Sequence, residues 1–70
     1  MSDHVYSVSE IVGSSPDSIE DAINSALARA RKTLRHLNWF EVKEVRGYLT
    51  DDGAVDYYQV AIKLGFRMEE

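Results

Sequence analysis

Residues 58–68, YQVAIKLGFRM, carry the clearest secondary-structure pattern in this sequence of 70 residues. Large apolar residues alternate along the segment with polar or small ones, which is typical of a β-strand buried on one face. The expected buried side consists of Tyr58, Val60, Ile62, Leu64, Phe66 and Met68. The expected opposite side consists of Tyr57, Gln59, Ala61, Lys63, Gly65 and Arg67.

The residues that precede this strand predict a hairpin. Residues 50–54, TDDGA, contain an Asp-Gly pair at 52–53, which is a strong signal for a tight turn between two strands. The segment WFEVKEVRGYLT at 39–50 is rich in β-branched and aromatic residues and is the expected partner strand. Asp51 and Asp52 are interpreted as turn residues that shape the backbone.

A long amphipathic helix is predicted before the hairpin. Gly13 is expected to break a first strand, Ser15 to cap the helix, Pro16 to occupy its first position, and Asp17 to favour its positive end. The apolar stripe predicts a helix of about 20 residues. Its members are Ile19, Ala22, Ile23, Ala26, Leu27, Ala30, Leu34 and Leu37. Asn38 tolerates a left-handed backbone and is the expected end of the helix.

Residues 4–12, HVYSVSEIV, read as the first strand, which gives the order β-α-β-β over a single domain of residues 1–70. The predicted fold is α+β, with a curved three-stranded antiparallel sheet wrapped around one helix. One helix covers only one face of three strands, so the second face is left for solvent or for neighbouring subunits.

The composition favours a small globular protein that oligomerises. A chain this short buries roughly 60% of its unfolded surface, so small domains usually add disulfides, metals or further subunits. The sequence has no cysteine, and His4 and His36 share no ligand spacing, so neither a disulfide nor a metal site is expected. Oligomerisation is therefore the expected way in which this small domain is stabilised.

The charge and the hydrophobic pattern exclude several partners. A net charge of −4 argues against a nucleic-acid binder, although four basic residues form a local cluster: Arg29, Arg31, Lys32 and Arg35. The sequence has neither a signal-peptide pattern nor a run of 18 apolar residues. We therefore expect a cytoplasmic protein with no membrane partner.

No enzymatic motif is found. The sequence contains no Gly-rich phosphate loop, no H-E-x-x-H and no Gly-x-Ser-x-Gly. Glu10, Glu41 and Glu44 are explained by a solvated sheet face, and His36 by its place in the last predicted helical turn. We therefore expect no catalytic residues.

Trp39 and Gln59 are the residues whose positions are hardest to explain by packing alone. Phe40 and Val42 have the phase that faces the helix, which directs Trp39 to the opposite, bare face, where Gln59 is also expected. An exposed indole can stack on a flat aromatic ligand, and a carboxamide suits the polar edge of a heterocycle. The alternatives are a core or subunit contact for the indole and a cross-strand polar pair for Gln59.

Two arginines are candidates for a phosphate. The guanidinium groups of Arg46 and Arg67 match phosphate geometry. Surface ion pairs explain them equally well, with three acidic residues as candidate partners: Glu41, Glu44 and Asp56.

The sequence resembles the dodecins, a family of small flavin-binding proteins. The resemblance covers nearly the whole chain. It includes V-Y-x-V-x-E-I-V-G-x-S near the start, A-L-A-R-A-R-K-T-L-R in the helix, L-N-W-F-E-V-K-E-V-R-G, and then Y-Q-V and L-G-F-R-M-E. The pattern is the bacterial one more than the halophilic archaeal one.

This resemblance implies a homododecameric hollow shell with flavins bound in pairs between subunits. The tryptophan that sandwiches the flavin corresponds to Trp39, and the glutamine that bonds the isoalloxazine corresponds to Gln59. Arg46 and Arg67 correspond to arginines associated with FMN phosphate and shell contacts. FMN is the expected ligand and riboflavin is the alternative.

Some bacterial relatives also bind coenzyme A on the outside of the shell. The corresponding candidates here are His4, Tyr6, Arg29, Lys32, Thr33 and Arg35. The histidine at position 4 departs from the lysine of some relatives, which leaves this second site open.

The family resemblance implies storage and sequestration of flavin, with quenching of its photochemistry, and no enzymatic turnover. Two other functions stay open from the residues: a flavin-dependent oxidoreductase, and a scaffold without ligand in which Trp39 serves only as a subunit contact.

Overall fold

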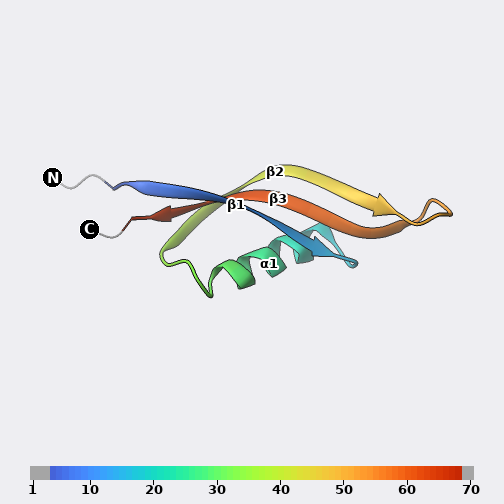
Figure 1. Cartoon of the computed structure of the whole chain (residues 1–70), viewed down its shortest axis with the longest axis horizontal. Coiled ribbons are helices and arrows are strands. Elements are labelled where there is room, and N and C mark those ends of the chain that lie inside the picture. Colours follow the sequence, from blue (N-terminus) through green and yellow to red (C-terminus); the bar gives the residue numbers. More distant parts are fainter. Residues whose placement is uncertain (1–3, 69–70) are drawn as a thin grey trace.

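The computed structural model describes residues 4–68 and contains four elements in the order β-α-β-β (Figure 1). These are β1 (Tyr6–Ser15), α1 (Ile19–Ala30), β2 (Leu37–Leu49) and β3 (Val55–Arg67). The strands form one sheet in the order β1-β3-β2, and both pairings are antiparallel. The predicted α+β fold, with one helix and a three-stranded antiparallel sheet, is confirmed.

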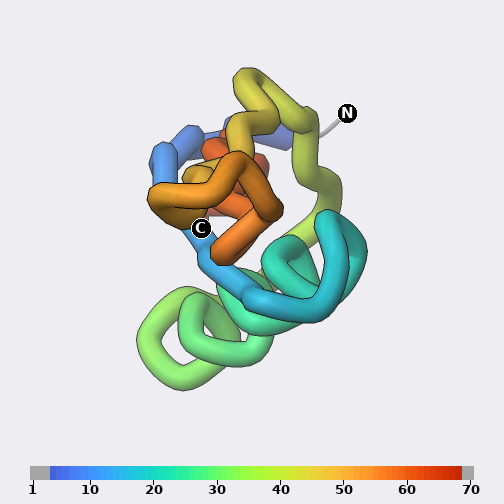
Figure 2. The backbone as a smooth tube through the Cα atoms, turned by 90° about the vertical axis from the view of Figure 1, so that its right-hand side faces the viewer, coloured from blue at the N-terminus to red at the C-terminus, as the bar shows by residue number. Residues whose placement is uncertain are grey.

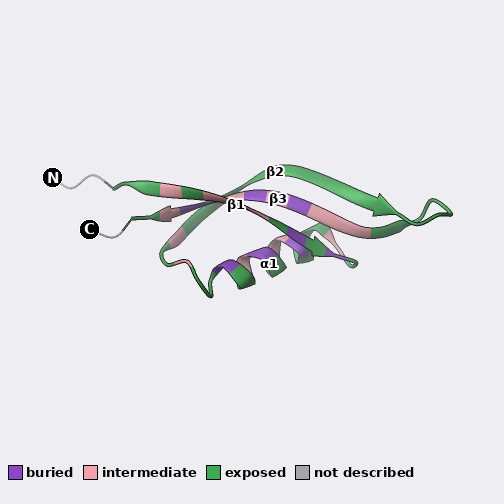
Figure 3. Cartoon of the chain, in the orientation of Figure 1, coloured by how far each residue is buried: buried purple, intermediate pink, exposed green. Residues whose placement is uncertain are grey.

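The helix lies on one face of the sheet, against β1 and the adjoining part of β3 (Figure 2). The core between them consists of Ala22, Ala26, Ala30, Val60, Ile62 and Leu64. Three of these residues belong to the predicted buried side of β3, so that part of the alternation is confirmed, whereas Met68 lies beyond the strand and is exposed. Purple segments in Figure 3 follow this line along β3 and α1.

The start of the helix differs from the prediction. β1 continues through Gly13 to Ser15, and α1 is capped by Ser18, whose hydroxyl accepts a hydrogen bond from the Asp21 backbone N–H at 2.9 Å. Ser15 is buried, donates to Asp21 Oδ2 at 2.7 Å and accepts from the Asp17 backbone N–H at 2.9 Å. A serine therefore caps the helix, but it lies three residues later than expected because Ser15 instead orders the connecting turn.

Gly13 does not break β1 but lets the helix approach it. The residue is buried, and a Cβ atom built on it would overlap the backbone carbonyl of Ala22 and lie 2.9 Å from the Ala26 Cβ. The glycine is therefore required because α1 packs closely against β1, and not because the strand ends there.

The helix also ends earlier than predicted. It stops at Ala30 after 12 residues, and the next turn closes with bonds from Thr33 N and Leu34 N to the Ala30 carbonyl. Leu34 and Leu37 nevertheless pack against the core. The apolar periodicity therefore continues beyond the end of the helix, which is why the predicted helix was too long. The left-handed residue is His36, with φ of 61°, and not Asn38.

The hairpin and its turn agree with the prediction. Thr50 N donates to the Ala54 carbonyl at 2.7 Å, and Gly53 takes the positive φ of 88° that the turn requires. The hairpin extends well beyond the end of the helix (Figure 1), in a molecule that measures 58 × 20 × 13 Å.

β2 presents apolar side chains that nothing in the single chain covers. Phe40, Val42 and Val45 pair with Leu64, Ile62 and Val60, and so lie on the helix side of the sheet. The helix does not reach them, and each is more than 40% exposed. A subunit with so small a core and so much exposed apolar surface favours association.

Candidate functional site

The sheet face opposite α1, here called the outer face, carries the predicted binding residues. Its cross-strand register sets side chains in rows. One row joins Val8, Gly65 and Trp39, and another joins Ser14, Gln59 and Arg46. Trp39 and Gln59 therefore share the face on which the alternation predicted them.

The indole of Trp39 lies flat over Gly65. A Cβ built on Gly65 would overlap three atoms of the indole, namely Cε2, Cζ2 and Nε1. Gly65 is buried although it belongs to the outer face, whereas Trp39 is 41% exposed. The missing side chain therefore gives the ring a backbone seat, and the opposite side of the ring faces away from the sheet.

A β-bulge places Arg46 beside Gln59. From Trp39 to Val42, alternate residues of β2 face the helix, and a register shift between Val42 and Glu44 then inserts Lys43 as an extra residue. After the shift, Glu44 and Arg46 lie opposite Ala61 and Gln59 on the outer face. Simple alternation from Trp39 would have put Arg46 on the helix side, so the bulge was the feature that sequence patterns did not reveal.

A hydrogen-bond network surrounds the Gln59 amide. Arg46 Nη1 donates to Gln59 Oε1 at 2.8 Å, and Tyr48 Oη donates to the same oxygen at 3.3 Å. Arg46 Nη2 also pairs with Glu44. The cross-strand polar pair considered for Gln59 and the ion pair considered for Arg46 are thus both present.

The Trp39 seat and the Gln59 network are far apart within one chain. Gly65 and Gln59 are six residues apart along β3, which corresponds to roughly 20 Å at the rise of a β-strand. An ion pair between Lys43 and Glu10, with an N–O distance of 3.0 Å, lies across β3 between these two places. One tricyclic ring cannot touch both residues of the same chain.

Arg67 lies at the other end of the outer face from Gln59. It pairs with Tyr6 across the β1–β3 ladder, and its backbone N–H donates to the His36 carbonyl at 3.1 Å. Arg67 lines a hollow with Arg35, His36 and Met68. Arg67 is thus near the Trp39 end and apart from Arg46.

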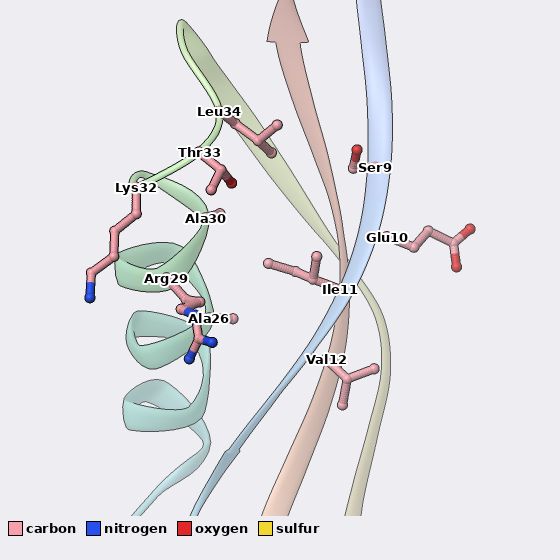
Figure 4. Close-up of a pocket in the computed structure, with 10 residues that line it drawn as sticks. All are labelled: Ser9, Glu10, Ile11, Val12, Ala26, Arg29, Ala30, Lys32, Thr33 and Leu34. Atoms are coloured by element: carbon pink, nitrogen blue, oxygen red, sulfur yellow. The ribbon is translucent and has the colours of Figure 1, made fainter.

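The candidates for coenzyme A are not gathered in one place. A hollow of about 450 Å³ between α1 and β1 is lined by Arg29, Lys32 and Thr33 (Figure 4), where Ile11 points toward the helix and Glu10 away from it. Arg35 lines the hollow near Arg67. Tyr6 belongs to the outer face, and His4 is exposed just before β1.

Two features concern metals and membranes. Within residues 4–68, no three histidine, aspartate or glutamate side chains are placed together as metal ligands. No helix of this part of the chain is long and apolar enough to span a bilayer.

The geometry defines a small β-α-β-β subunit with an exposed indole plate on the sheet face away from its helix. The dodecin family model matches residues 5–69, and the chain belongs to the dodecin family. It is 59% identical over 66 residues to a dodecin from Thermus thermophilus, a match that covers 94% of each chain.

Solved structures agree in fold. A tryptophan-to-phenylalanine variant of the T. thermophilus dodecin superposes with a TM-score of 0.90 at 56% identity, covering 97% of this chain and 100% of that chain. The dodecin from Streptomyces coelicolor superposes with a TM-score of 0.92 at 54% identity, covering 100% of this chain and 99% of that chain. Dodecins are in general binding proteins and not enzymes, they are known to bind flavins, and the family implies an oligomer.

Two residues of this face, Gly65 and Tyr48, were not predicted as parts of the site. Gly65 appeared only as a small residue in an alternating strand, although a glycine opposite a tryptophan is a recognisable signal for close approach. Tyr48, which stacks on Tyr57 with ring centroids 4.8 Å apart, was expected only as part of a strand.

Proposed function

We propose that this protein stores and sequesters flavin by stacking FMN pairs between Trp39 residues of neighbouring subunits in a dodecameric shell. The observation that carries the proposal is the flat seating of the Trp39 indole on Gly65. One side of the ring is held by backbone, and the other side is available to stack on an isoalloxazine.

The separation of Trp39 from Gln59 supports a site shared between subunits. Because about 20 Å of β3 lies between them, a flavin that stacks on one chain's Trp39 receives its amide contact from another chain's Gln59. The exposed apolar residues of β2, such as Phe40 and Val42, supply the surface for that association.

Arg67 is the proposed phosphate contact. It lies near the Trp39 end of the outer face beside Arg35, and a guanidinium pairs with phosphate through two parallel hydrogen bonds. Arg46 was predicted for the same role, but its Nη1 and Nη2 bond Gln59 and Glu44 within the chain. We therefore propose that Arg46 contributes to the site chiefly through Gln59, and that FMN binds more tightly than riboflavin because of Arg67.

Stacking on Trp39 also accounts for the proposed quenching of flavin photochemistry. An electron-rich indole in contact with an excited flavin transfers an electron rapidly, which quenches fluorescence and photochemistry. A ring sandwiched on both sides is also shielded from a second substrate, which favours storage over a flavin-dependent oxidoreductase.

The test is FMN titration followed by flavin fluorescence. The unaltered protein is expected to quench FMN, and Trp39→Ala to weaken binding about 10- to 100-fold, because stacking of a planar base on an aromatic side chain contributes roughly 1–3 kcal/mol. Equal affinity of the two proteins would contradict the stacking role. NADH oxidation faster than that by free FMN would favour the oxidoreductase instead.

The hollow between α1 and β1 supports coenzyme A as a second ligand. Arg29 and Thr33 offer a guanidinium and a hydroxyl beside it, whereas the Lys32 ammonium points away from β1 (Figure 4). A guanidinium and a hydroxyl suit a phosphate group. Calorimetric titration with coenzyme A is expected to show binding that Arg29→Gln weakens. Absence of heat with the unaltered protein would remove this second proposal and leave flavin binding unaffected.

A further inference from the structure

The orientation of the Gln59 amide is determined by its neighbours. The Arg46 guanidinium has only N–H donors, so the Gln59 atom that lies 2.8 Å from Nη1 must be the carbonyl oxygen. The Tyr48 hydroxyl approaches the same oxygen at 3.3 Å. The carbonyl oxygen therefore has two donor groups near it within the chain.

The two donors are themselves held in place. Glu44 pairs with Arg46 Nη2, the terminal nitrogen that does not bond Gln59. The Tyr48 ring stacks on Tyr57 with an interplanar angle of 13°, and such stacking fixes the direction of the phenol. Gln59 is half-buried between them. Rotation of the amide by 180° would set its NH₂ group against the guanidinium, two donors facing each other.

We propose that Arg46 and Tyr48 are positioning residues that make Gln59 present only N–H donors to the flavin. This inference rests on the flavin-binding function proposed above. The oxidised isoalloxazine has acceptors at N1, N5 and its two carbonyl oxygens, and a single donor at N3–H. Gln59 then recognises one of the acceptors and does not accept from N3–H.

Two substitutions at Gln59 test the direction of the hydrogen bond. Glutamate has nearly the same shape but, when ionised, only accepts, whereas methionine has a similar length and provides neither N–H nor carbonyl. The probe is riboflavin, which carries no phosphate and so avoids repulsion by the new carboxylate. We expect Gln59→Glu to bind riboflavin no more tightly than Gln59→Met, with both about tenfold or more weaker than the unaltered protein. Tighter binding by Gln59→Glu than by Gln59→Met would overturn the donor assignment.

A double-mutant cycle tests positioning. Tyr48→Phe keeps the ring on Tyr57 and removes only the hydroxyl. In the presence of Gln59 this change is expected to weaken riboflavin binding several-fold, and in the Gln59→Met background to have no effect, because Tyr48 acts through the amide. Arg46→Met is likewise expected to weaken riboflavin binding when Gln59 is present and to have no effect in the Gln59→Met background. An equal effect in both backgrounds would show that these residues act on the flavin or the fold directly, which contradicts the proposal.

The positioning of Gln59 and the binding of flavin can fail independently in these experiments. Binding of riboflavin by the unaltered protein, lost in Trp39→Ala, supports the flavin site whatever the order of the Gln59 variants. Failure of the unaltered protein to bind riboflavin or FMN would overturn both proposals.

Discussion

The contact between Trp39 and Gly65 shows how one absent side chain prepares a binding surface. The indole rests on backbone in a place that any Cβ would occupy. A ring seated in this way needs little reordering when a ligand stacks on it, and such preorganisation reduces the entropy cost of binding.

Replacing Gly65 by alanine is therefore expected to displace the indole and weaken FMN binding by about tenfold or more, on the scale of one lost stacking contact. Fluorescence titration measures the change. The matched control is Gly47→Ala, because a Cβ at Gly47 would have its nearest neighbour, the Tyr57 carbonyl oxygen, at 3.9 Å. Unchanged affinity in Gly65→Ala would show that the seat is not needed.

At the scale of elements, the close packing of α1 against β1 depends on Gly13. Ala22 and Ala26 of the helix come close enough to β1 that no side chain fits at this position. We expect Gly13→Ala to lower the free energy of unfolding by about 1–3 kcal/mol, as is usual for overpacking in a core. Denaturant unfolding checks this, with Ser14→Ala on the exposed side of the same strand as the control. Equal stability of the two variants would contradict the close packing.

The hairpin turn has its own pH dependence. The Thr50 hydroxyl donates to the Asp52 carboxylate, which, with backbone N–H groups, lowers the pKa of Asp52 below its ordinary value of 3.8. A carboxyl with a lowered pKa stabilises the folded turn above pH 3.8, and this contribution is lost as the pH falls through the folded-state pKa. NMR titration is expected to give a pKa below 3.8 for Asp52, shifted back toward 3.8 in Thr50→Val. A pKa at or above 3.8 in the unaltered protein would contradict the turn geometry.

Periodicity predicted the elements because each has one buried side. The alternation of Val60, Ile62 and Leu64 located β3 and its buried face correctly. The same reasoning made the helix too long, because Leu34 and Leu37 pack on the core from a loop and a strand start. It could not find the bulge at Lys43, because an inserted residue changes the phase of a strand without a distinctive residue type.

At the scale of the whole molecule, the side chains that matter are those that the single chain leaves uncovered. Phe40, Val42 and Val45 form an apolar row on the helix side of β2, next to the core but outside the reach of α1. A second copy of the chain that covers this row would bury it and extend the core.

Val42→Asp is expected to prevent assembly, because a carboxylate in a subunit contact loses its hydration without gaining a partner. Light scattering coupled to size exclusion should report a smaller species that no longer quenches FMN. Val42→Ile keeps the apolar character and is the control. A full-size assembly of Val42→Asp would show that this row is not part of the interface.

Native mass spectrometry of the protein titrated with FMN tests the central claim most directly. A pair of flavins between two tryptophans corresponds to one flavin for each Trp39, so the account predicts a dodecamer that saturates at one FMN per chain. A monomer that binds FMN equally well, or a dodecamer that binds none, would contradict it.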